Sequence, residues 1–365
     1  LDSSELSLVS SCDIVIIDVD SIVRIFLQGD NGDPSAKAVC TGEVLYCILR
    51  ILEALASCVS NIMFVRHYID NAELPDCCML NTVAASVSGV VLSAQLEYPK
   101  VSLQYVDLCQ CLSSDWAADR LYDEYAAADG EIEVCYRQST RFVKRYIACP
   151  DNLCLVPSPV VKQPKRPGAY IITGGLGGLG LLTAKVLVEL GCTDHIVLVS
   201  RSGRVSYEGQ GLESDLSWLM DRHLHGGPRV HIERCDVSDE SEVIGLLSTV
   251  RGLCGSISGI IHAAGVLRDG MLRGGKALSG CMSVWNAKAA SGWYLHTHSL
   301  CDDLVHFICY SSITASLGNP GQCAYGGSNS FLDHLMNVRV GSGLCGTSIQ
   351  WPSILGVGMA AANNL

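Results

Sequence analysis

The chain has 365 residues, which is more than one ordinary hydrophobic core needs, and its length predicts two domains. Hydrophobic residues make up 48% of the sequence and charged residues 17%, so disorder over most of the length is excluded. The net charge of -12 argues against a nucleic-acid or anionic membrane partner, because phosphates would be repelled. Since no apolar run reaches the roughly 18 residues of a membrane-spanning helix, we expect no membrane span.

The 19 cysteines do not have the spacing of a metal site. Cys77 and Cys78 are adjacent, Cys109 and Cys111 are separated by one residue, and paired Cys-x-x-Cys motifs are absent. We therefore predict no metal and interpret most cysteines as small buried side chains in a reducing compartment, the cytoplasm. The chain starts at Leu1 without a signal-peptide pattern, and we interpret it as a piece of a longer polypeptide.

The first half alternates strand and helix patterns. A β-branched run predicts a buried strand at 14–17, and the next expected elements are a helix at 41–57, a strand at 61–67, a helix at 86–96, a strand at 101–108 and a hairpin within 131–147. This alternation predicts a mainly parallel sheet. No glycine-rich loop follows the first strand, and residues 18–34 carry aspartates that would repel a pyrophosphate. We therefore predict a truncated, cofactor-free Rossmann-like subdomain over residues 1–160, ending in a linker with five prolines at 150–167.

Residues 161–365 are predicted to form a doubly wound α/β subdomain that binds the cofactor. A strand at 169–173 leads into a glycine-rich segment and then into an apolar helix that reaches Leu190. Glycines are needed there because the backbone must approach a pyrophosphate closely at a helix N-terminus. The cofactor-binding residues predicted in this segment are Thr173, Gly174, Gly175, Gly177, Gly178, Leu179 and Gly180.

The following strand ends determine the choice of cofactor. The strand at 195–200 ends at Ser200 and is followed by Arg201. An NAD site would carry an acidic residue at this point to bind the ribose hydroxyl groups. A cation suits a 2′-phosphate and predicts NADPH, although a solvated loop arginine is the alternative. Asp236, followed by Val237, is placed to accept a hydrogen bond from the adenine amine or to cap the next helix. Small residues after the next strand leave room for the nicotinamide: Ala263, Ala264 and Gly265.

Four residues near the C-terminal end form the predicted catalytic group. Ser312 lies thirteen residues before Tyr325, Asn329 lies four after it, and Lys288 lies twenty-four before Ser312. These motifs resemble the ketoreductase domains of polyketide synthases and animal-type fatty acid synthases, members of the short-chain dehydrogenase/reductase superfamily. Most stand-alone members have lysine four residues after the tyrosine, and the exchange of lysine and asparagine is typical of synthase ketoreductases.

The resemblance implies a role for each of the four residues. Ser312 would hydrogen-bond the substrate carbonyl, and Tyr325 would donate a proton to the developing alkoxide. Because the pKa of a free tyrosine is about 10, Lys288 would lower it by stabilising the ionised form, and Asn329 would help to resupply the proton. Segments at 61–66, 89–99 and 106–108 are similar to the family's structural subdomain, so the resemblance covers nearly the whole chain.

The sequence departs from the family in three places. Leu267-Arg268-Asp269 stands where many members read Leu-Asp-Asp, and no tryptophan occurs at 315–322, which together indicate a D (3R) product. Gly326 and Gly327 replace an alanine-rich stretch, and we expect them to loosen their helix by about 1 kcal/mol each. The chain ends soon after Trp351-Pro352, where the family continues into a substrate lid, so the lid is expected to be missing.

The resemblance implies an NADPH-dependent 3-oxoacyl-[acyl-carrier-protein] reductase of polyketide or fatty acid biosynthesis. Its partners would be an acyl carrier protein that bears a phosphopantetheine-linked β-ketoacyl chain, and the neighbouring synthase domains. Two alternatives remain open: a free-standing short-chain alcohol or ketone dehydrogenase, and a non-catalytic ketoreductase-like scaffold.

Overall fold

A computed structural model describes residues 13–28, 34–68, 75–109, 113–148, 168–206 and 210–354, together with 356 and 358. The chain forms two compact units. The first comprises Leu1–Val160, Arg268–Met282 and Thr314–His334, and the second comprises Val161–Leu267, Ser283–Ile313 and Leu335–Leu365. Each unit contains its own sheet, which confirms the prediction of an α/β fold with two Rossmann-like parts. The roles assigned to residues 1–160 and 161–365 stay predictions, and the linker at 150–167 lies outside the described residues.

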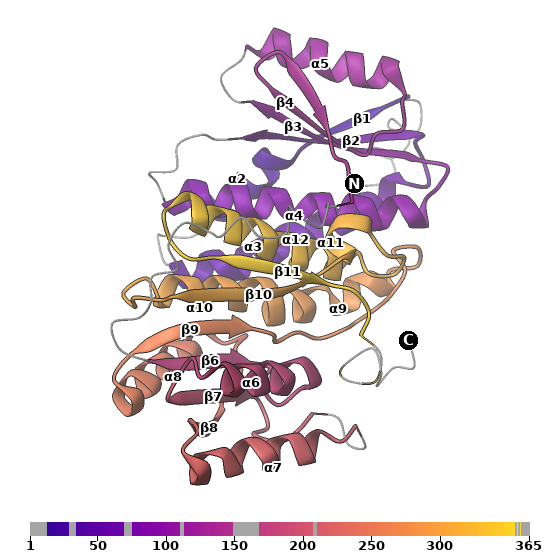
Figure 1. Ribbon diagram of the computed structural model, residues 1–365. Coiled ribbons are helices and arrows are strands. Elements are labelled where there is room, and N and C mark those ends of the chain that lie inside the picture. Colours follow the sequence, from indigo (N-terminus) through magenta and orange to yellow (C-terminus); the bar gives the residue numbers. More distant parts are fainter. Residues whose placement is uncertain are drawn as a thin grey trace. The chain divides into compact units, whose positions relative to one another are not determined.

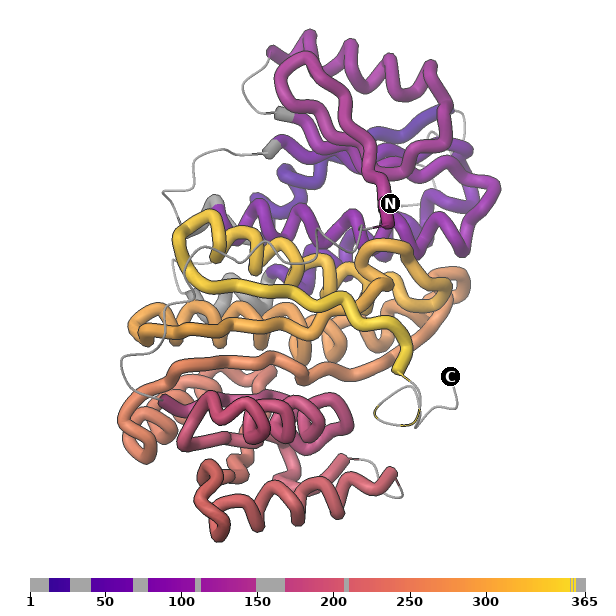
Figure 2. The backbone as a smooth tube through the Cα atoms, viewed as in Figure 1, coloured from indigo at the N-terminus to yellow at the C-terminus, as the bar shows by residue number. Residues whose placement is uncertain are grey.

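The first unit is built on a five-stranded sheet whose strands follow chain order (Figures 1 and 2). Its strands are β1 (Val15–Asp18), β2 (Asn61–Tyr68), β3 (Ser102–Cys109), β4 (Glu133–Arg137) and β5 (Thr140–Val143). The first four are parallel, and β5 returns antiparallel to β4 as the predicted hairpin. Alternate side chains of the sheet form a buried cluster that contains Met63, Val65, Val106, Leu108, Val134 and Tyr136.

Four helices of this unit are α2 (Val19–Gln28), α3 (Pro34–Leu55), α4 (Pro75–Glu97) and α5 (Ser114–Ala127). The sequence did not predict α2 and α5. Two of the aspartates that we interpreted only as unfavourable for a pyrophosphate, Asp18 and Asp20, have structural roles, whereas Asp30 and Asp33 lie outside the described residues. Asp18 caps α2, because its carboxylate accepts hydrogen bonds from the Asp20 N–H and the Ser21 hydroxyl. The buried Asp20 carboxylate accepts the His67 N–H at 2.5 Å and joins α2 to β2.

Helix α4 passes through the core of the first unit. By length and composition alone, its segment Cys78–Glu97 is apolar enough to cross a membrane, with a mean hydropathy of 1.4. However, 78% of its apolar window is buried inside the protein, as in the core helix of a globular fold. The segment is therefore weak evidence for a membrane span.

The second unit contains a six-stranded, all-parallel sheet with the order β11-β10-β9-β6-β7-β8 (Figure 1). Its strands are β6 (Ala169–Thr173), β7 (His195–Ser200), β8 (Arg229–Arg234), β9 (Ile257–His262), β10 (His306–Ser312) and β11 (Thr347–Trp351). Because the order reverses at β6, the carboxyl ends of β6 and β9 form the switch point at which Rossmann folds bind their ligands.

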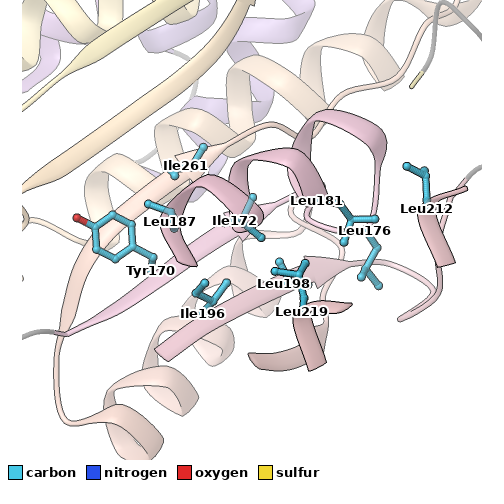
Figure 3. Packing of buried hydrophobic residues seen from close by; sticks show 11 residues of the cluster. Tyr170, Ile172, Leu176, Leu181, Leu187, Ile196, Leu198, Leu212, Leu219 and Ile261 are labelled. Carbon is cyan, nitrogen blue, oxygen red and sulfur yellow. The ribbon is translucent and has the colours of Figure 1, made fainter. Parts of the chain in front are cut away.

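The helices that connect these strands are α6 (Gly178–Leu190), α7 (Leu212–Arg222), α8 (Glu240–Cys254) and α10 (Ser291–His298). A buried cluster fixes α6 and α7 on the sheet, and Figure 3 shows Leu181 and Leu187 of α6 packed beside Ile172 and Leu198 of the strands. Three of these side chains have no exposed surface, and truncating such a residue to alanine typically costs about 2–5 kcal/mol. The cluster therefore holds the N-terminus of α6 firmly against the carboxyl end of β6.

Candidate cofactor and catalytic site

The glycine-rich loop after β6 is a tight turn that only glycine fits. Gly174 has a φ of +65°, and a Cβ atom there would lie 2.8 Å from the Ala263 carbonyl oxygen. A Cβ at Gly175 would lie 2.6 Å from the Ile172 carbonyl oxygen, and one at Gly180 would collide with the Gly174 carbonyl. The backbone thus folds closely on itself and leaves no side chain between the loop and a ligand.

The N-terminus of α6 presents backbone donors to this loop. Gly177 is the N-cap, no side chain makes a capping hydrogen bond, and the first turn contains no acidic residue. The N–H groups of a first helical turn and the positive end of the helix dipole favour an anion. Together with the glycine turn, these features fit the pyrophosphate of a dinucleotide.

Basic residues follow the neighbouring strand ends. Arg201 is exposed directly after β7, and the Ser200 hydroxyl accepts the Gly203 N–H at 3.0 Å to shape the turn. Ser200 pairs in register with Arg234 at the end of β8, and Arg234 donates from Nε to the Arg201 carbonyl at 3.5 Å. Arg234 is a second guanidinium beside the predicted phosphate site, and sequence reasoning missed it.

Asp236 follows β8, as predicted, but it is not the helix cap. Its Oδ1 accepts from the N–H of Ser238 at 3.1 Å and from the Ser238 hydroxyl at 2.7 Å. The N-cap of α8 is Asp239, whose carboxylate accepts the N–H groups of the first turn. The capping alternative for Asp236 is therefore wrong, because the chain makes one further turn before α8; the adjacent Val237 is buried.

A chain of hydrogen bonds through His262 connects the phosphate-loop strand to the lysine segment. The buried His262 ring lies 2.7 Å from the Thr173 hydroxyl through Nδ1 and 3.0 Å from the Lys288 carbonyl oxygen through Nε2. Since a carbonyl only accepts, Nε2 carries the proton and Nδ1 accepts from Thr173, whose oxygen in turn accepts the Ala264 N–H. Burial lowers the pKa of His262 to about 3, which keeps the ring neutral.

Sequence reasoning used this segment only for its small residues and did not assign a role to His262. A histidine at the end of a strand that is buried on both sides was the available signal. Gly265 has a separate role, because a Cβ there would lie 2.9 Å from the Lys288 Cε atom. The small residue therefore leaves space for the lysine side chain.

Lys288 lies in a π-helical turn, Asn286–Ala290, between α9 (Lys276–Trp285) and α10. Such turns are rare in proteins, and those that occur are often found at functional sites. The lysine is 3% exposed, and its Nζ donates to the Tyr310 carbonyl in β10 at 2.5 Å. Ser312, two residues further along β10, is the last residue of that strand. The second unit thus brings the predicted lysine to the end of the strand that carries the predicted serine.

Tyr325 and Asn329 belong to the first unit, in the first turns of α12 (Cys323–Gly341). Asn329 is fully buried, and its Nδ2 donates to the Tyr325 carbonyl at 2.8 Å. The Tyr325 side chain is half-buried. The asparagine therefore sits one turn below the tyrosine and bonds its backbone.

The loop before Tyr325 is held by two acidic residues. Gln322 donates from Nε2 to Asp269 at 2.8 Å, which ties this loop to the Leu267-Arg268-Asp269 segment. Glu97, the last residue of α4, accepts the Gly321 N–H at 2.9 Å and the Leu272 N–H at 2.7 Å. Sequence reasoning missed Glu97, since nothing local marks a carboxylate at a helix end as a partner for distant backbone donors.

Gly326 and Gly327 allow α12 to approach α4 closely. A Cβ at Gly326 would lie 2.7 Å from the Gly89 carbonyl oxygen, and one at Gly327 would lie 2.8 Å from Val90 and 3.0 Å from Leu45. The expectation that these glycines loosen the helix considered helix propensity alone. Their packing against α4 and α3 gives them a tertiary role.

The family model described as "KR domain" matches residues 168–356, more than half of the chain. The naringenin synthase of Pestalotiopsis fici is 32% identical over 297 residues, which cover 78% of this chain and 10% of that protein. A phenolphthiocerol/phthiocerol polyketide synthase chain of Mycobacterium tuberculosis is 29% identical over 290 residues, which cover 76% of this chain and 14% of that protein. The chain therefore spans about a tenth of the length of such curated relatives.

Solved structures agree with these relatives. An A1-type ketoreductase is 27% identical with a TM-score of 0.73, and the match covers 88% of this chain and 65% of that one. A structure of A-type ketoreductases from a modular polyketide synthase is 25% identical with a TM-score of 0.76, over 98% of this chain and 72% of that one. With the fold and the family match, these similarities show that the chain belongs to the ketoreductase (KR) domains of polyketide synthases, within the short-chain dehydrogenase/reductase superfamily.

Proposed function

We propose that this domain reduces the β-keto group of an acyl thioester on an acyl carrier protein, with NADPH as the reductant, inside a polyketide or fatty acid synthase. The observation that carries the proposal is the placement of Lys288. Lysine is rarely buried, yet this one is 3% exposed, lies in a π-helical turn and donates to the strand that ends in Ser312. The family match supports a ketoreductase, and superfamily members use a nicotinamide cofactor.

The strand ends support NADPH rather than NADH. The glycine turn and the N-terminus of α6 would hold the pyrophosphate, and Arg201 with Arg234 would bind the 2′-phosphate through charge-assisted hydrogen bonds. Asp236 would accept from the adenine amine through Oδ2, since both of its contacts with Ser238 use the other carboxylate oxygen, Oδ1. When bound, the cofactor supplies a hydride to the carbonyl carbon.

Residues of this chain bind and protonate the carbonyl oxygen. The Ser312 hydroxyl donates a hydrogen bond to it, and the Tyr325 hydroxyl gives it a proton as negative charge develops. The Lys288 ammonium stabilises the tyrosinate that remains, and Asn329 fixes the turn of α12 that carries the tyrosine. Donors that are placed before the reaction need not reorganise during it, which is the physical reason for this rigid setting.

We further propose a D (3R) alcohol as the product. Asp269, which is retained from the family's acidic loop, bonds Gln322 three residues before Tyr325. This contact supports a role for the loop in presenting the substrate to the tyrosine. The absence of tryptophan at 315–322 supports the same configuration of the alcohol.

We propose that this domain works beside the other domains of a synthase and that it is located in the cytoplasm, a reducing compartment. The relatives are large synthases of which this chain spans 10–14%, which supports neighbouring domains. Cysteines buried without a disulfide, among them Cys235, Cys281 and Cys323, support a reducing compartment.

The test is NADPH oxidation with a β-ketoacyl N-acetylcysteamine thioester, followed by chiral analysis of the alcohol. Tyr325→Phe should abolish turnover and retain NADPH binding, whereas Tyr122→Phe, at a tyrosine that is 69% exposed, should behave as wild type. Turnover of small free ketones without turnover of thioesters would favour a free-standing dehydrogenase. Failure of the wild type to bind NADPH would favour a non-catalytic scaffold.

A further inference from the structure

Two histidines and a cysteine meet at the second sheet, away from the glycine loop. His195 begins β7, His231 lies in the neighbouring strand β8, and Cys254 is the last residue of α8. His195 Nδ1 lies 3.1 Å from His231 Nε2, and the rings stack with their centroids 5.3 Å apart. One ligand atom from each of the three residues lies within 4.8 Å of the other two, and all three side chains are half-buried.

We propose that His195, His231 and Cys254 bind a divalent metal ion of the zinc type. Imidazole nitrogen and thiolate sulfur are the ligands that Zn²⁺ prefers in proteins. Two nitrogens that bind one tetrahedral zinc at about 2.0–2.1 Å lie about 3.3 Å apart, which is close to the 3.1 Å between His195 Nδ1 and His231 Nε2. The cysteine sulfur would be the third ligand, and zinc sites with three protein ligands take water as the fourth.

The cysteine distinguishes this cluster from a simple pair of histidines. The Cys254 sulfur lies within 4.8 Å of the ligand nitrogens of both His195 and His231. A hydrogen bond between the two histidines alone would not require a sulfur at the same point.

The position of the cluster assigns it a structural role rather than a catalytic one. His195 stands at the amino end of β7, whereas the predicted cofactor residues follow the carboxyl ends of the strands. A metal held here would join β7, β8 and α8 through bonds stronger than their side-chain packing. The spacing of the cysteines could not reveal it, because two of the three ligands are histidines and the histidines are 36 residues apart.

Cobalt and zinc titrations of the purified, metal-free chain test the proposal. Wild type should bind one Co²⁺ with a thiolate-to-metal charge-transfer band, and Zn²⁺ should displace it. Cys254→Ser should remove the band and weaken Zn²⁺ binding by more than about tenfold, since a direct ligand should matter at least as much as the outer-shell partners of a metal site. Cys301→Ser, at an exposed cysteine, is the matched control and should leave both unchanged.

A second measurement guards against a variant that fails to fold. Zn²⁺ should raise the melting temperature of the wild type and of Cys301→Ser, and should leave that of Cys254→Ser unchanged. His231→Gln should behave as Cys254→Ser does. A wild type without saturable binding, or a charge-transfer band that persists in Cys254→Ser, would overturn the proposal. Neither readout uses ketoreductase turnover, so the outcome is independent of the proposed function.

Discussion

The contact between α4 and α12 gives a prediction whose sign depends on the structure. Gly326 follows Tyr325 in α12 and faces Gly89 of α4. A Cβ at position 326 would lie 2.7 Å from the Gly89 carbonyl oxygen and 3.0 Å from the Ser93 hydroxyl. The carbonyl oxygen is part of a helix backbone, so it cannot turn aside as a flexible side chain would.

Two opposing effects determine the stability of Gly326→Ala. Alanine in place of glycine within a helix favours folding by about 1 kcal/mol. To restore an ordinary carbon–oxygen separation, however, the two helices must move apart by about 0.8 Å, and overpacking of this kind costs about 1–3 kcal/mol. Because the obstacle is backbone, we expect the higher part of that range and a net destabilisation of about 1–2 kcal/mol.

The matched control is Gly245→Ala in α8. This glycine is exposed, and a Cβ there would meet nothing within 4 Å. Only the helix propensity changes, so we expect a stabilisation of about 1 kcal/mol. Urea unfolding followed by circular dichroism measures both variants as shifts of the transition midpoint at a constant slope.

Activity provides a second readout, since Tyr325 shares a turn with Gly326. A displacement approaching 1 Å at a reacting group reduces turnover by up to about 100-fold, so Gly326→Ala should lower kcat well below that of Gly245→Ala. If Gly326→Ala raised the unfolding midpoint as Gly245→Ala does, the close approach of the two helices would be refuted. The glycines would then act only through helix propensity.

Three further outcomes are expected. Arg201→Ala should weaken NADPH binding by roughly 10–100-fold and leave NADH binding unchanged, whereas Arg204→Ala should affect neither; fluorescence titration with both cofactors measures this. Glu97→Ala should lower stability by about 1–3 kcal/mol in urea unfolding because two backbone N–H groups lose their acceptor, and Glu97→Gln should lose less. Burial lowers the pKa of His262 to about 3, below the value of about 6.5 in the unfolded chain, so the unfolded state takes up the proton first as the pH falls. Stability should therefore decline below pH 6.5, by about 2 kcal/mol at pH 5 from this residue alone, and a flat profile between pH 7 and pH 5 would contradict it.

Two strands of the second unit, β6 and β7, were predictable because their signals are local. β6 and β7 begin and end at the predicted residues, and α6 ends at Leu190 as expected. Each is a short apolar run bounded by glycine or polar residues, which fixes its ends without reference to the rest of the fold. The glycine loop and Arg201 belong to the same class, since a phosphate-binding turn is a contiguous sequence feature.

The helices of the first unit show where local patterns fail. α4 begins at Pro75, eleven residues before the expected start at 86, and α3 begins at Pro34 instead of 41. In α4 most side chains from Met79 onward are buried, so apolar residues occur all round the helix and no amphipathic period marks its start. Only the proline, which is favoured in a first helical turn, identifies the boundary.

The residues that position the site could not be identified from the sequence. Glu97 meets Gly321 across 224 residues, and His262 meets Thr173 across 89. Neither contact has a local pattern, because each depends on which strand or helix the fold brings next to it. The residues of the predicted chemistry therefore lie in short sequence motifs. The position of these motifs depends on buried polar contacts between distant segments. Substitutions at these contacts should change turnover without touching the motif, and a search by motif alone would rank such a weakened domain as intact.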